Sequence, residues 1–182
     1  SAEMQVLRTS LVPGALQIAR HNIHRGSMDL RLFEMGTTFS QAEGKRPDSL
    51  EAYEQKTGLL LLLCGNHAPV SYSVPGRKID LFDMKGEVEA ILKKFCLDKY
   101  RLIYYDTHSA LSDKVVNIEI KSTYAGSLGS VKKQVLKAFD IADDVYVCEL
   151  NVEALLEAAG AIRKVKPPPK FPSVTRDLAF VV

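Results

Sequence analysis

The chain has 182 residues, of which 46% are hydrophobic and 25% are charged, and its formal net charge is +2. These values are ordinary for a soluble globular domain with a full core. A net charge this small does not by itself imply nucleic-acid binding, so any RNA contact must be local. The longest apolar run, residues 59–64, is far too short to span a membrane, and no signal peptide is visible.

The first predicted elements are a helix over residues 10–25 and a strand over 30–39. Ser10 is the expected N-cap, and Gly26 supplies the left-handed stop. Apolar residues recur in the helix at three- and four-residue spacing, whereas the period changes to two in the strand. One face of that strand carries Phe33, Met35, Thr37 and Phe39.

The next segment is polar and then strongly apolar. Residues 40–57 predict a solvated connector, and residues 66–79, which hold two prolines and a glycine, predict a mobile loop. Between them, five consecutive leucines start at Leu59 and run to Leu63. This run is too short for a helix, so it predicts a strand covered on both faces.

The remaining pattern alternates helices and strands and predicts an α+β domain. We expect Asp80, Ser130 and Asn151 to cap helices. The fold class is a mostly antiparallel sheet flanked by helices. Further helices are expected over 81–97, 131–139 and 152–159, and further strands over 101–105, 115–121 and 145–150, with a strand or a wide turn over 122–129.

Cys64, Cys96 and Cys148 are odd in number, far apart and embedded in apolar segments. This usage predicts buried thiols in a reducing, cytoplasmic compartment, with neither disulfides nor zinc.

Three stretches carry a family resemblance. They read L-R-T-S-L-V-P-G-A-L followed by L-R-L-F-E-M-G-T-T-F, then L-F-D-M-K-G-E-V-E, and finally K-A-F-D-I-A-D-D-V-Y-V-C-E-L. Together they resemble the catalytic-like module of the bacterial phenylalanyl-tRNA synthetase beta subunit. That module is a degenerate copy of the class II aminoacyl-tRNA synthetase core, so the resemblance implies a class II core-like fold.

The resemblance also implies that adenylation chemistry is absent. In active class II enzymes, the phenylalanine of the matching strand is followed by an arginine that binds the ATP α-phosphate. Here Phe39 is followed by Ser40, Gln41 and Ala42. A serine hydroxyl cannot replace a permanently charged, bidentate guanidinium. The later G-x-G-x-x-R element, which places a second phosphate-binding arginine in active enzymes, is missing too.

On this resemblance, residues 1–162 are a non-catalytic scaffold that packs against the catalytic alpha subunit. The whole enzyme would be a cytoplasmic α2β2 heterotetramer that joins phenylalanine to its tRNA with ATP and Mg²⁺. Residues 163–170 form a basic, proline-rich linker, and residues 171–182 resemble the first strand of a truncated ferredoxin-like anticodon-binding domain. We therefore expect a piece of a longer protein.

The sequence shows no residue pattern that indicates a catalytic, cofactor-binding or metal-binding site. The best tRNA-contact candidates are the linker cations Arg163, Lys164, Lys166 and Lys170, which a solvated linker explains equally well. His21 and His24 lack a third metal ligand, and Asp140, Asp143 and Asp144 lack the rest of a calcium loop. The G-x-x-G at 126–129 predicts a turn, and Tyr104, Tyr105 and Tyr124 predict core or interface packing.

Three other functions remain open from sequence. The module could regulate the enzyme through a vestigial adenylate or amino-acid pocket. It could be a free-standing synthetase-like paralogue with another role. It could also be mainly an RNA binder, although the small net charge weighs against this.

Overall fold

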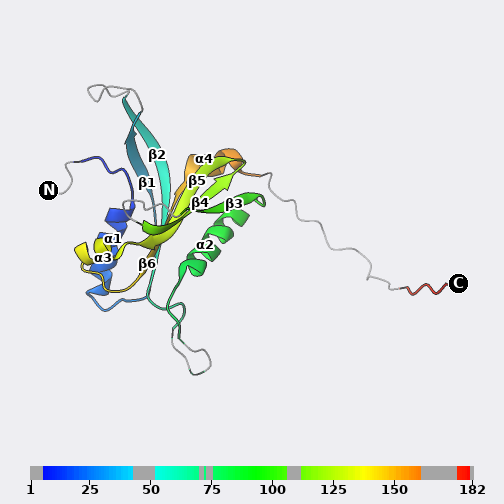
Figure 1. Ribbon diagram of the computed structural model, residues 1–182, viewed down its shortest axis with the longest axis horizontal. Coiled ribbons are helices and arrows are strands. Elements are labelled where there is room, and N and C mark those ends of the chain that lie inside the picture. Colours follow the sequence, from blue (N-terminus) through cyan, green and yellow to red (C-terminus); the bar gives the residue numbers. More distant parts are fainter. Residues whose placement is uncertain are drawn as a thin grey trace.

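The computed structural model describes residues 6–42, 52–69, 72, 76–105, 112–160 and 176–180, without the side chain of residue 113. These residues form a six-stranded antiparallel sheet of order β1-β2-β6-β5-β4-β3. Helices α1 and α3 cover one face, and α2 and α4 cover the other (Figure 1). The predicted α+β class is therefore confirmed. The elements are α1 (Val12–Ile23), β1 (Leu30–Gln41), β2 (Tyr53–Cys64), α2 (Leu81–Lys94), β3 (Tyr100–Tyr105), β4 (Ser112–Ile120), β5 (Thr123–Val131), α3 (Lys133–Ala138), β6 (Val145–Asn151) and α4 (Val152–Ala158).

The leucine run of β2 explains why the sheet is covered on both sides. Leu60 and Leu62 are buried under α1 and α3, whereas Leu63 is buried in the cluster that contains α2 and α4. Leu59 and Leu61 pack against that second cluster and are half-buried. Successive strand side chains point to opposite faces, so one apolar strand supplies both cores.

The polar start of β2 was wrongly predicted as part of a connector. Residues 53–57 form a strand because each pairs with a residue of β1, from Gln41 opposite Tyr53 to Thr37 opposite Thr57. Backbone pairing decides the conformation here, and the side chains stay polar because this part of the hairpin is largely exposed.

Two of the predicted capping residues are found at the N-caps of their helices, and two are not. Asp80 caps α2 and Asn151 caps α4, as predicted. Ser10 precedes the N-cap residue of α1, although its Oγ still accepts a hydrogen bond from the Val12 amide at 3.1 Å. Ser130 lies within β5 and does not cap α3.

The G-x-x-G segment at 126–129 also lies in β5, so the strand predicted as one alternative over 122–129 is confirmed and the turn is wrong. Gly126 has a φ of +152°, and a Cβ atom there would lie 2.3 Å from the Glu149 carbonyl oxygen. Close approach to β6 therefore requires this glycine.

None of the described helices is long and apolar enough to cross a membrane. Residues 176–180 form neither helix nor strand, and the side chains of Leu178 and Phe180 are exposed. They lie within the predicted strand 171–182, whose assignment to a further domain remains a prediction. The linker 163–170 lies outside the described residues.

Candidate protein-interaction site

An uncovered apolar strip runs along β1, the edge strand of the sheet. Phe33 and Met35 point to the face that carries α2 and α4, yet they are 78% and 67% exposed. Their cross-strand neighbours on β2 are Leu61 and Leu59, which are half-buried. Large apolar side chains that are this exposed and adjacent are typical of an interaction surface.

The strip continues into a groove between β1 and α2. We call it the β1–α2 groove, and it encloses about 170 Å³. Apolar side chains supply most of its lining, and the ion pair of Arg31 with Glu87 supplies the charged part. The lining residues are Arg31, Leu32, Phe33, Leu61, Leu63, Glu87 and Ile91.

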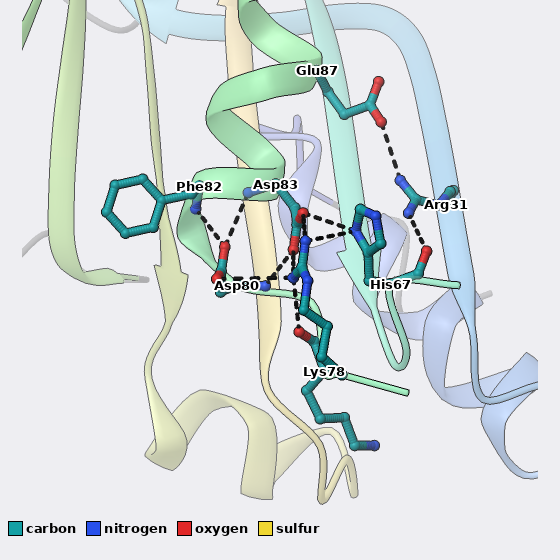
Figure 2. A network of polar contacts seen from close by, with 8 residues as sticks. Arg31, His67, Lys78, Asp80, Phe82, Asp83 and Glu87 are labelled. Atoms are coloured by element: carbon teal, nitrogen blue, oxygen red, sulfur yellow. Dashed lines mark hydrogen bonds and ion pairs between the residues drawn. The ribbon is translucent and has the colours of Figure 1, made fainter. Parts of the chain in front are cut away.

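Arg31 connects the groove to the loop that precedes α2. Its Nη1 lies 3.1 Å from Glu87 Oε1, and its Nη2 donates to the His67 carbonyl at 2.8 Å. Figure 2 shows Arg31 reaching from β1 to both partners. Arg31 therefore joins β1 to α2 and to the loop that precedes α2.

A denser polar cluster holds the first turn of α2. Arg77 donates two hydrogen bonds of 2.7 Å to the Asp83 carboxylate, whose side chain is only 9% exposed. These bonds hold the pKa of Asp83 well below its usual range, even though burial opposes this shift. Asp83 also accepts from the Asp80 amide, which completes the capping box at this helix end.

His67 joins the same cluster through one ring nitrogen. Its Nδ1 lies 2.9 Å from Asp83 Oδ1 and 3.0 Å from Arg77 Nη2 (Figure 2). These contacts attach the described ends of the predicted mobile loop to the first turn of α2. An isolated antiparallel bridge between Asn66 and Lys78 also joins the two ends to each other. Residues 70–71 and 73–75 of that loop lie outside the described residues.

Arg8 connects the segment before α1 to the edge strand β1. Arg8 Nη1 donates to Glu34 Oε1 at 2.7 Å, and Arg8 Nε donates to the Thr37 carbonyl at 2.9 Å. Ser40 lies opposite Glu54 in the β1–β2 ladder. The Glu54 carboxylate is itself paired with Lys56 Nζ at 3.1 Å.

The other sequence candidates are dispersed. His24 Nε2 contacts Asp140 Oδ2 at 3.3 Å, and among the described residues no group of three potential ligands could hold a metal ion. Asp143 and Asp144 pair with Lys78 and Lys133. Tyr104, Tyr105 and Tyr124 lie on strands but are 55%, 39% and 53% exposed, so they are not core residues. The tRNA-contact candidates Arg163, Lys164, Lys166 and Lys170 lie outside the described residues.

Sequence reasoning missed the groove itself. The alternation in β1 correctly placed Phe33 and Met35 on one face, but it could not show that the helices on this face leave both side chains exposed. That information depends on where α2 and α4 pack, which is a property of the whole sheet.

Comparison with known proteins gives a consistent result. Residues 1–152 match the family model described as the phenylalanyl tRNA synthetase beta chain CLM domain. The phenylalanine–tRNA ligase beta subunit of Chlorobium luteolum is 36% identical over 188 residues, which cover 100% of this chain and 23% of that protein. The Geobacter sulfurreducens beta subunit is 34% identical, and the match covers 99% of this chain and 22% of that protein. The chain thus spans less than a quarter of these relatives.

The fold is shared with a solved synthetase. The pyrrolysyl tRNA synthetase PylSc of Desulfitobacterium hafniense superimposes with a TM-score of 0.57 over 85% of this chain and 54% of that one. The sequences are only 15% identical, so this likeness concerns the fold alone.

Proposed function

Because the chain belongs to the family of phenylalanyl-tRNA synthetase beta chain CLM domains, we propose that it is a non-catalytic scaffold of a phenylalanine–tRNA ligase. In this proposal, the β1–α2 groove docks the catalytic alpha subunit of an α2β2 enzyme. That enzyme would use ATP and Mg²⁺ to attach phenylalanine to its tRNA in the cytoplasm.

The exposure of Phe33 and Met35 beside the groove carries the proposal. Burying a phenylalanine or methionine side chain contributes about 1.5–3 kcal/mol, so covering both would favour association. A stable interface buries about 800 Å² on each partner, so the groove would be one part of a larger contact. The ion pairs of Arg8 with Glu34 and of Arg31 with Glu87 support a structural role for both arginines.

A matched pair of substitutions tests the proposal. Phe33 and Phe82 are both 78% exposed, but Phe82 lies on the first turn of α2, away from Arg31 and Glu87 (Figure 2). We expect Phe33→Glu to abolish co-purification with the alpha subunit and Phe82→Glu to preserve it. Neither should lower the melting temperature of the isolated chain appreciably, because both side chains are solvated. Intact assembly of the Phe33→Glu variant would show that the groove is not the docking site.

A further inference from the structure

A second surface lies on the opposite face of the sheet, at the C-terminal end of α1. Gln17, Arg20, His21, His24 and Arg25 line a hollow of about 470 Å³, which we call the α1 hollow. Apart from Gln17, every residue in the lining is a cation or an imidazole. All five side chains are exposed.

The positive charge of the α1 hollow is not neutralised locally. From Val12 to Gly26 the chain has no acidic residue. Within the described part of the chain, neither Arg20 nor Arg25 forms an ion pair or a side-chain hydrogen bond. One carboxylate reaches the rim, since Asp140 Oδ2 lies 3.3 Å from His24 Nε2. The guanidinium groups are thus free to bind an anion.

The spacing of these residues favours an extended anion over a single carboxylate. Arg20 and His21 lie in the last turn of α1, whereas His24 is the C-cap residue and Arg25 follows the helix. Both arginines line the α1 hollow from different positions around the end of the helix. They can therefore engage two separate anionic groups of one ligand. Guanidinium groups bind phosphates bidentately, which favours a phosphodiester chain over single carboxylates.

We propose that the α1 hollow binds the phosphate backbone of an RNA. The choice of RNA rests on the proposed function, because an enzyme that acts on a tRNA must bind this polyanion. The α1 hollow lies on the α1–α3 side of the sheet, whereas the β1–α2 groove lies on the α2–α4 side. An RNA and a catalytic subunit can thus be bound at the same time.

The test measures fluorescence anisotropy of a labelled RNA stem-loop with the 182-residue chain. Potassium chloride is varied from about 50 to 200 mM, because each phosphate contact contributes about −0.9 to the slope of log K against log salt. Replacing both arginines (Arg20→Gln with Arg25→Gln) should weaken binding and reduce the slope by about 2. Asp140→Asn should strengthen binding, and asparagine tolerates the positive φ of +56° found there.

Lys93→Gln with Lys94→Gln is the matched control, because it also removes two exposed cations from the end of a helix, here α2. Equal loss of RNA affinity in the control and the arginine variant would overturn the proposal. So would the absence of RNA binding at low salt, or equally effective competition by polyglutamate. The arginine variant should still co-purify with the alpha subunit. If it keeps RNA affinity but loses the alpha subunit, the α1 hollow is a protein interface and the proposal is wrong.

Discussion

Ser10 and Glu149 are 139 positions apart in the chain, yet the Ser10 hydroxyl donates to the Glu149 carboxylate at 2.9–3.0 Å. Glu149 Oε1 also accepts from the Leu11 amide at 2.7 Å, and Ser10 Oγ accepts from the Val12 amide. Strand β6 therefore supplies the negative charge that the N-terminus of α1 prefers. The Glu149 carboxylate, which is distant in sequence, thus takes the place of a local capping side chain at the N-terminus of α1.

Replacing Glu149 by alanine should destabilise the fold by about 1–3 kcal/mol, because two donors lose a charged acceptor. Urea unfolding measures this loss. Glu149→Gln should cost less, since an amide oxygen can still accept. Glu157→Ala, which removes an exposed carboxylate from α4, should change stability by less than about 0.5 kcal/mol. Equal effects of Glu149→Ala and Glu157→Ala would contradict the capping role.

Asp83→Asn should lower stability at pH 7 by about 1–2 kcal/mol, through loss of the Arg77 ion pair. The hydrogen bonds from Arg77 depress the folded-state pKa of Asp83, so the stability it contributes is fully present above the unfolded pKa of about 3.9. That contribution is lost as the pH falls from there through the folded-state pKa. The stability difference between wild type and Asp83→Asn should therefore shrink below about pH 4. Urea midpoints across this range provide the measurement, and a difference independent of pH would refute the linkage.

Gly86→Ala should stabilise the chain by about 0.5–1 kcal/mol, because alanine is the better helix former. Gly86 lies inside α2, and a Cβ atom added there meets nothing within 4 Å. A thermal melt tests this. Gly65→Ala is the contrasting variant, since Gly65 has a φ of +92° and its Cβ would lie 2.4 Å from the Met28 carbonyl oxygen. We expect Gly65→Ala to destabilise, and stabilisation by both variants would be inconsistent with this geometry.

The three thiols should react at different rates with a disulfide reagent near pH 8. Burial raises the pKa of Cys64 to about 11 and the pKa of the fully buried Cys148 further, so both remain protonated in the folded chain. Cys96 is only half-buried. One thiol per chain should therefore react quickly, and Cys96→Ser should remove that phase. Fast labelling of two or three thiols in the folded protein would contradict the observed burial.

Local signals in the sequence predicted most of the fold. The caps at Asp80 and Asn151 and the leucine run of β2 follow from neighbouring residues, and the structure confirms them. The errors occur where distant partners decide the conformation. Residues 53–57 form a strand because of β1, and Gly126 lies in a strand because β6 approaches it closely.

The candidate site was less predictable. Arg8 pairs with Glu34 and Arg31 with Glu87, which lie 26 and 56 positions away in the chain, so no local pattern predicts these contacts. The exposure of Phe33 depends on which helices pack over β1, which no local pattern encodes. The two arginines of the α1 hollow likewise follow the ordinary preference for cations at a helix end, so their lack of ion pairs could be seen only in three dimensions.

The long β1–β2 hairpin has a consequence for local dynamics. β2 pairs with β6 from Gly58 to Cys64, whereas residues 53–57 pair with β1 alone among the described strands, and the hairpin extends beyond the sheet (Figure 1). An isolated two-stranded ribbon is marginally stable. Where the two-stranded ribbon joins the sheet, the Glu153 carboxylate accepts a hydrogen bond from the Thr57 amide at 2.9 Å. Amide hydrogen exchange should thus be slow at Leu60 and Leu62 and fast before Thr57, so that a single strand contains both well-protected and poorly protected backbone.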